Sequence, residues 1–398
     1  AAPVAASAAA PAASAAEEEN CILGLTKKPK YVFLFIGDGM SYPQFQAAAD
    51  YLGAVNDPDY MQAEPSVKER NGAKLDGPKE LNFMKFDVAG SAVTYDSCSF
   101  APDSASTATS IEAGYKVVTT QEDAAKVIPQ NRKVIIIDEH LADSDAMDYE
   151  LDRVRGEWAL KDYVKKGIEV LDNSTGFFMM CEGGKIDWAC HANDAGSTVA
   201  DTIALADAVQ VAIDFAKEHP DDTLFLVTGD HETGGLTIGY AGTDYDTYLT
   251  NLTSQKISFA QFDEQYVEAY KQNNTSFEDA MKDVEKLFGL KLKGEEGDKL
   301  VLTEYETQRL KDAYAVAMSE YDSGEFTQEQ YVLYGTYNPF SVTITHILNN
   351  KSGIDFTSYS HTGLPVAVFA EGIGEEAFTG YYDNTQIYFK LASMLKVK

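Results

Sequence analysis

The stretch Thr223–Gly235, TLFLVTGDHETGG, joins an apolar run to a turn that carries two acids and a histidine. A short continuous apolar run of this kind predicts a strand that is buried on both faces, as in a parallel sheet. Four other runs have the same character. They are Tyr31–Ile36, Val134–Ile137, Gly176–Cys181 and Leu364–Ala370.

Helical patterns lie between these predicted strands. They cover Tyr42–Leu52, Ser104–Gly114, Glu157–Leu171 and Thr198–Glu218. The alternation predicts an α/β fold, with a central, mostly parallel sheet and helices on both faces.

Three regions differ in composition. Residues 1–28 begin as an Ala/Pro/Ser-rich, low-complexity segment, which we interpret as a tether or as what remains after signal cleavage. Residues 239–338 are Tyr-rich, charged and helix-like, and they interrupt the strand–helix alternation. We therefore predict a core over 29–238 and 339–398, with an inserted, mainly helical subdomain over 239–338. We also expect a periplasmic or secreted protein.

The charge is strongly negative. The 398 residues include 32 Lys and Arg against 63 Asp and Glu, so 32 − 63 gives −31. Nucleic acids and anionic membranes need basic surfaces, so neither is an expected partner. No run of about 18 apolar residues predicts a membrane span. The charge suits divalent cations, and it repels an anionic substrate unless the site reverses the sign locally.

Acids follow three of the predicted strands: Asp38, Glu182 and Asp230. Ligands of open α/β sheets bind outside the carboxyl ends of the strands. One such acid alone is as readily explained by a helix cap. Three together at one edge repel one another, so we expect cations between them.

Three of the six histidines lie in acid- or Gly-rich turns. Asp187 and His191 share one face if their segment is helical, and this is a two-ligand arrangement from one turn. His231 follows Asp230, and His361 precedes the last predicted strand. Imidazole with carboxylate suits Zn²⁺, whereas carboxylates alone suit Mg²⁺. For His140, His219 and His346 we favour a structural role.

Ser104 is the candidate nucleophile. It follows Asp103 at the expected start of a helix, where the helix dipole favours phosphate and an ionised serine. The alternative is that Asp103 or Ser104 only caps that helix.

Five short motifs in this order make the chain resemble the alkaline phosphatase family, and the tail Tyr382–Ile387 fits the same pattern. Trp188 resembles the tryptophan that some bacterial members carry beside the zinc ligands. The motifs are Gly37-Asp38-Gly39-Met40, Asp103-Ser104-Ala105, Glu182 to His191, Gly229 to Gly235, and His361-Thr362-Gly363.

The resemblance implies a metal-dependent phosphomonoester hydrolase with two Zn²⁺ and one Mg²⁺ per chain. Its substrates would be small-molecule phosphate monoesters, split through a covalent phosphoserine at Ser104. The sequence leaves the oligomeric state undecided, with a homodimer as one possibility. The implied ligands are Asp187, His191 and His361 for the first zinc, Asp38, Asp230 and His231 for the second, and Glu182 with Asp38 for the magnesium.

The chain departs from the family between Ser104 and Glu182, where only 77 residues intervene. We find no complete His/Asp-x-Thr-Pro element there. His140 has a suitable spacing, but Ala142 stands where the threonine is expected. Arg132, Arg153 and Arg155 are the candidates for the arginine that grips phosphate.

The departure keeps two other functions open. One is a phosphodiesterase or sulfatase on the same scaffold. The other is a non-catalytic, acidic cation-binding protein. The inserted subdomain would serve as a lid, a dimer arm or a substrate filter.

Overall fold

A computed structural model describes residues 28–58, 76–94, 116–129, 133–142, 146–295 and 297–397. The low-complexity segment up to residue 27 lies outside these ranges. So does the predicted helix Ser104–Gly114, and with it the candidate nucleophile. Arg132 also lies outside them.

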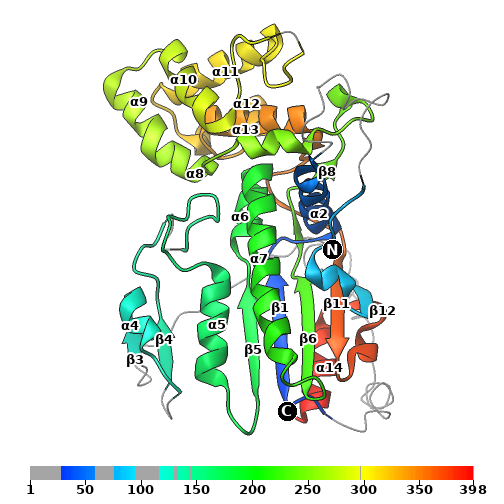
Figure 1. Cartoon of the computed structure of the whole chain (residues 1–398). Coiled ribbons are helices and arrows are strands. Elements are labelled where there is room, and N and C mark those ends of the chain that lie inside the picture. The colour runs from blue at the N-terminus through cyan, green and yellow to red at the C-terminus, as the bar shows by residue number, and fades with distance from the viewer. Residues whose placement is uncertain are drawn as a thin grey trace, which may run out of the picture.

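The described residues form a central six-stranded sheet in the order β12-β2-β11-β6-β1-β5. The only antiparallel pairs in this sheet are those that β11 makes with β2 and β6. The other five strands therefore point one way, and the predicted mostly parallel α/β sheet is confirmed (Figure 1). The strands are β1 Tyr31–Gly37, β2 Val88–Val93, β5 Phe177–Glu182, β6 Thr223–Gly229, β11 Val366–Gly372 and β12 Gly380–Asp383.

Both faces of the sheet are covered, because successive side chains of a strand point to opposite faces. Phe33 and Phe225 point to one face, where they pack in a core with α2, α5 and α7. Val32 and Leu226 point to the other face, where they pack with α14. These helices are α2 Tyr42–Asn56, α5 Leu160–Leu171, α7 Ala195–Ala216 and α14 Thr385–Leu395.

Two of the predicted strands differ from expectation. β5 is an edge strand, and Phe178 and Met180 are 45% and 51% exposed, so it is not buried on both faces. The run at Val134 forms the short strand β4 (Val134–Ile136), which pairs only with β3 (Lys116–Val118) in a separate two-stranded sheet. The helix α4 (Gln121–Ala125) connects these two strands. An apolar run thus marked a strand correctly without specifying its partner.

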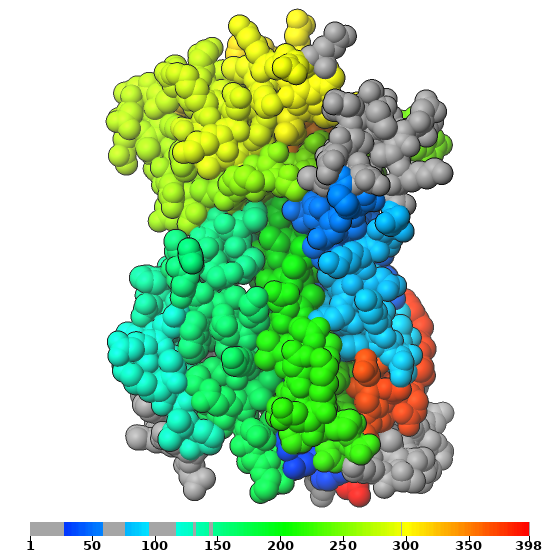
Figure 2. Space-filling view, in the orientation of Figure 1, coloured from blue at the N-terminus to red at the C-terminus, as the bar shows by residue number. Residues whose placement is uncertain are grey.

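A layer of helices lies at the end of the sheet where β1, β5 and β6 terminate (Figure 1). Figure 2 shows the same yellow-green layer seated on the green and blue surface below it. Its aromatic residues, among them Phe262, Phe288 and Phe340, belong to the same hydrophobic core as Phe33 of β1. We call α8–α13 the helical layer: α8 Phe259–Phe262, α9 Glu268–Asn273, α10 Phe277–Phe288, α11 Glu304–Ala317, α12 Gln328–Tyr334 and α13 Pro339–Ser352.

Several short elements connect the sheet to the helical layer. The helix α6 (Lys185–His191) follows β5 directly. Two two-stranded ladders join the chain after β6 to the chain before β11: β7 (Glu232–Thr233) with β10 (His361–Thr362), and β8 (Thr237–Ile238) with β9 (Ile354–Asp355). Among the described residues, no helix combines the length and the apolar character that crossing a membrane requires.

The shared core predicts that the helical layer and the sheet unfold together. Phe262 is fully buried, and its ring centroid lies 5.2 Å from that of Phe288 and 6.2 Å from that of Phe340. Phe262→Ala should lower the free energy of unfolding by about 3–5 kcal/mol. The urea transition should shift equally by far-UV circular dichroism and by tryptophan fluorescence.

The fluorescence is best read in a Trp188→Phe background. The chain has two tryptophans, and this leaves Trp158, which packs beside α5 away from the helical layer. Val332→Ala is the control, because this residue of α12 is 67% exposed. If only the circular dichroism transition moves, the helical layer unfolds on its own.

Candidate metal centre and active site

The predicted ligands converge at the carboxyl ends of three neighbouring strands. Asp38 follows β1, Glu182 ends β5, and Asp230 and His231 follow β6. The other predicted ligands lie on two further elements. Helix α6 carries Asp187 and His191, and β10 begins at His361.

Asp187, His191 and His361 form the first cluster. The Nε2 atom of His191 lies 3.4 Å from Asp187 Oδ2 and 3.2 Å from His361 Nε2. His361 Nε2 lies 3.8 Å from Asp187 Oδ1. On its other side, His191 Nδ1 is 2.6 Å from the backbone oxygen of Tyr359. A carbonyl only accepts, so Nδ1 carries the proton and Nε2 presents its lone pair to the cluster.

Asp38, Asp230 and His231 form the second cluster, with His231 Nε2 3.3 Å from Asp38 Oδ1 and 3.6 Å from Asp230 Oδ2. Thr233 fixes the imidazole. Its hydroxyl donates to Asp187 Oδ1 and lies 3.2 Å from His231 Nδ1. The Thr233 hydroxyl has one proton, and Asp187 accepts it. Nδ1 of His231 therefore donates to the Thr233 oxygen, and Nε2 of His231 presents its lone pair to the cluster.

The two clusters adjoin one another. The rings of His231 and His361 stack with centroids 3.6 Å apart, and the ligand atoms of Asp187, His231 and His361 also lie within 4.8 Å of one another. All six predicted zinc ligands are therefore brought together from segments far apart in the sequence.

The donor atoms fit divalent metal ions. Asp38 Oδ1 and His231 Nε2 are buried, and neither makes a hydrogen bond. Buried polar atoms without partners are costly, and a cation would satisfy both. Carboxylate oxygens with imidazole nitrogens are a donor set typical of zinc.

The carboxylates act on one another. Burial, followed by the charges of Asp230, Asp187 and Glu182, raises the pKa of Asp38 to about 9. Burial, followed by Asp230, also raises the pKa of Glu182. Burial lowers the pKa of His231, which keeps its imidazole neutral. In the absence of cations, protonation of Asp38 relieves the repulsion.

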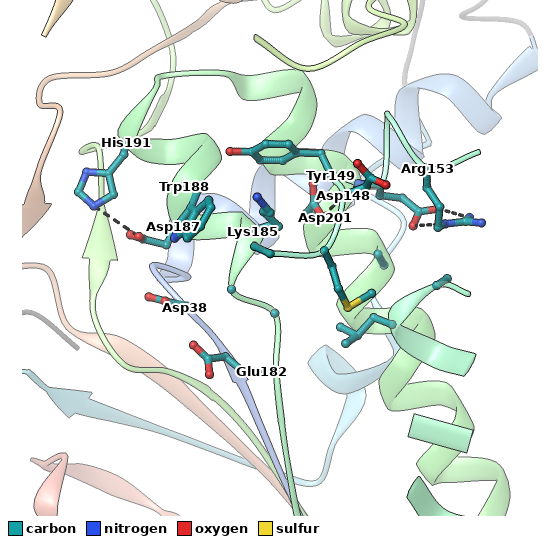
Figure 3. A pocket seen from close by; sticks show the side chains of 18 of the residues that line it. Asp38, Asp148, Tyr149, Arg153, Glu182, Lys185, Asp187, Trp188, His191 and Asp201 are labelled. Atoms are coloured by element: carbon teal, nitrogen blue, oxygen red, sulfur yellow. Dashed lines mark hydrogen bonds and ion pairs between the residues drawn. The ribbon is translucent and has the colours of Figure 1, made fainter. Parts of the chain in front are cut away.

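A cavity of about 800 Å³ opens beside the clusters. Figure 3 shows Asp38, Glu182, Asp187 and His191 on one side of it and Arg153 on the other. Lys185 lies between, with its Nζ 3.9 Å from the ring centroid of Trp188 and 4.4 Å from that of Tyr149. Among the described residues that line the cavity, Arg153 is the one arginine and Lys185 is the one lysine.

The structure separates the arginine candidates. Arg153 lines the cavity, and its Nε and Nη2 donate to the carboxylate of Glu150 at 2.9 and 2.5 Å. Arg155 is exposed and does not line the cavity. Nor does His140, which is exposed with its Nε2 3.6 Å from Glu139 Oε1. Glu182 and Asp38 therefore have no described partner from the His140 segment for a third metal.

The other two histidines are structural, as expected. His219 packs against the rings of Tyr31 and Phe215. His346 of α13 is held beside Asn193, with its Nε2 3.2 Å from Asn193 Oδ1, and burial lowers the pKa of His346 to about 3.

Asn193 connects the helical layer to a ligand segment. It has a left-handed backbone (φ 52°), which asparagine tolerates better than most residues. Its side-chain amide donates to the backbone oxygens of Cys190 and Ser358, at 2.8 and 2.9 Å. Its own backbone oxygen accepts from Asn349 of α13 at 2.7 Å. One residue thus fixes the end of α6, the loop that reaches His191, and α13.

Sequence reasoning missed several cavity residues. Tyr149 and Asp201 line the cavity, but they lie in segments without a motif, so nothing in the sequence marked them. Lys185 and Thr233 lie within motifs that were recognised, and only their roles were missed.

Comparisons with known proteins agree with this geometry. The family model described as alkaline phosphatase matches residues 112–397. The chain belongs to the alkaline phosphatase family. The predicted resemblance is thus confirmed, and the family implies divalent metal binding.

Two relatives come from Bacillus subtilis (strain 168). Alkaline phosphatase 4 is 30% identical over 284 residues, which are 70% of this chain and 52% of that protein. Alkaline phosphatase 3 is 30% identical over 277 residues, which are 69% of this chain and 51% of that protein. The chain thus spans about half the length of these curated relatives.

Solved structures of alkaline phosphatases share the fold. A cold-active alkaline phosphatase from a psychrophilic Shewanella aligns with a TM-score of 0.65 at 20% identity, over 92% of this chain and 99% of that chain. The Thermus thermophilus alkaline phosphatase aligns with a TM-score of 0.67 at 17% identity, over 94% of this chain and 93% of that chain.

The pKa of Asp38 makes a prediction for the metal-free protein. Because the folded state raises this pKa from 3.8 to about 9, folding holds a proton that the unfolded chain releases. The stabilisation is complete below the unfolded pKa and is lost as the pH rises towards 9. Asp38→Asn stays neutral, so it should flatten the fall in unfolding free energy across this range.

The measurement is urea unfolding of chelator-treated protein at about pH 5 and about pH 8. Glu218→Gln, at an exposed carboxylate, is the control and should keep the wild-type pH dependence. An unchanged pH dependence in Asp38→Asn would show that Asp38 is ionised without metal.

Proposed function

We propose that this protein is a phosphomonoester hydrolase that acts through a covalent phosphoserine at Ser104, with two zinc ions and a nearby magnesium ion. The observation that carries the proposal is the pair of adjoining clusters, in which three histidines and three aspartates converge beside a cavity.

The ligands divide as the family resemblance implies. Asp187, His191 and His361 would hold one zinc, and Asp38, Asp230 and His231 the other. Glu182 with Asp38 would contribute to the magnesium site. Bound divalent ions supply Lewis acidity, and they reverse the local negative charge that otherwise repels phosphate.

The chain's own groups then have distinct tasks. The hydroxyl oxygen of Ser104 would attack phosphorus as the bond from phosphorus to the leaving alcohol oxygen breaks. Water would then hydrolyse the phosphoserine and release inorganic phosphate, restoring the hydroxyl. Thr233 and the backbone oxygen of Tyr359 keep His231 and His191 in the tautomers that ligation needs.

Arg153 is the side chain we assign to phosphate. Its three hydrogen bonds, two to Glu150 and one to the backbone oxygen of Glu157, use three of the five N–H donors of a guanidinium. Two donors remain for phosphate oxygens, and Glu150 holds the guanidinium in place. The fork geometry of arginine suits a phosphate group better than lysine does.

Metal removal and Ser104→Ala test the proposal directly. Chelation should abolish hydrolysis of an aryl phosphate, and Zn²⁺ with Mg²⁺ should restore it. Ser104→Ala should lower turnover by about 10³-fold or more while zinc binding is kept. Acid quenching should trap phosphate on the wild-type serine.

A chelated protein with full activity, or a fully active Ser104→Ala, would contradict the mechanism. A preference for phosphate diesters or sulfate esters over monoesters would favour a different hydrolase on this scaffold. Metal binding with neither hydrolysis nor trapped phosphate would leave a cation-binding protein.

Arg153→Ala should weaken phosphate recognition. Loss of hydrogen bonds to a charged group costs about 1.5–3 kcal/mol, so kcat/KM should fall by roughly 10- to 100-fold. Inhibition by inorganic phosphate should weaken by a similar factor. Arg155→Ala is the matched control, since this exposed arginine does not line the cavity. Equal effects of the two substitutions would exclude a specific role for Arg153.

A further inference from the structure

We propose that Glu232 is a positioning residue that holds the zinc ligands of three chain segments in one arrangement. The inference rests on the proposed zinc site and goes beyond it, because Glu232 is not a predicted ligand. Its side chain is completely buried, and the residue begins β7 directly after His231.

Four donors surround this one carboxylate. Its Oε1 accepts from the side-chain amide of Gln44 at 2.7 Å and from the backbone N–H of Leu236 at 3.3 Å. Its Oε2 accepts from the backbone N–H of Gly235 at 3.1 Å and from the hydroxyl of Thr362. Gln44 and Thr362 belong to segments that are far from Glu232 in the sequence, so the carboxylate joins these two segments to its own.

The first link runs to His361. In the ladder of β7 and β10, Thr362 pairs with Glu232, and His361 pairs with Thr233. Successive residues of a strand point to opposite faces. One face therefore carries Thr233 and His361 towards the metal clusters. The other face is fastened by Glu232 and Thr362, so the carboxylate fixes the placement of His361.

The second link runs to Asp38. Gln44 lies in the first turn of α2, which starts just after Asp38, and its Oε1 accepts from the backbone N–H of Ser41 at 2.9 Å. The same amide that donates to Glu232 also donates to the backbone oxygen of Thr233, at 3.1 Å. The segment that carries Asp38 is thereby tied to the turn that carries His231.

A carboxylate suits this position because all four partners are donors. A glutamine at position 232 would keep the shape of the side chain. Its NH₂ group, which cannot accept, would replace one carboxylate oxygen and face two of these donors. The hydroxyl of Thr362 can rotate, but the backbone N–H groups of Gly235 and Leu236 cannot accept. A partner would be lost, and the segments would no longer share one anchor.

Zinc affinity tests the inference, since groups that orient metal ligands typically contribute 10- to 100-fold to it. Glu232→Gln should weaken zinc binding by about 10-fold or more in competition with a chelator, and it should alter the visible absorption of the Co²⁺-loaded protein. Thr362→Val removes one link with little change in shape, so it should weaken zinc less, in the same direction. Thr362→Val also tests the inference if the Glu232→Gln protein fails to fold.

Asp194→Asn is the matched control. Asp194 is another fully buried carboxylate with four donors: the backbone N–H and hydroxyl of Ser197, the amide of Gln255 and the backbone N–H of Phe259. None of these groups belongs to a ligand. Asp194→Asn should therefore lower stability, yet keep the zinc affinity and the Co²⁺ spectrum.

The outcomes separate the two proposals. Wild-type protein that binds no zinc would overturn the proposed function, and this inference with it. Wild-type zinc affinity and Co²⁺ spectra in Thr362→Val and in folded Glu232→Gln would overturn this inference alone. So would an equal loss of zinc in Asp194→Asn, because that would show a general effect of destabilisation.

Discussion

Mutual repulsion among clustered carboxylates is the constraint on which this molecule depends. Asp38, Glu182, Asp187 and Asp230 meet where three parallel strands end, and the burial of Asp38 and Asp187 strengthens the repulsion that these two feel. Protons or cations must offset it. A chain with a net charge of −31 can therefore attract an anion at one place, provided that divalent ions occupy that place.

Most of the surrounding structure serves to hold these groups against their repulsion. Parallel strands bring Asp38, Glu182 and Asp230 to one edge. The turn after β6 carries His231, whereas α6 carries His191 and β10 carries His361. Behind the ligands, Thr233, Glu232 and the backbone oxygen of Tyr359 supply hydrogen bonds that set tautomers and directions. The ordered arrangement of the ligands thus depends on uncharged or buried partners as much as on the ligands themselves.

The sequence predicted the convergence of ligands because position after a parallel strand determines where a side chain lies. It did not predict β2 or β12, whose residues VAGSAV and GYYD lack a continuous apolar run. Nor did it reveal that β11 runs antiparallel, because hydrophobicity carries no direction. Tyr149 could not be predicted as a cavity residue, since only tertiary packing brings it to Lys185.

Asn193 has a consequence for how such proteins can diversify. Its backbone and side chain together join α13, the loop at Ser358 and the end of α6. One asparagine in an uncommon backbone conformation therefore ties the helical layer to the segments that carry and contact His191. A chimera that takes the helical layer from another member must keep the two α13 residues that contact this asparagine, His346 and Asn349. Otherwise we expect the exchange to displace His191, so that a segment outside the ligand clusters would alter their arrangement.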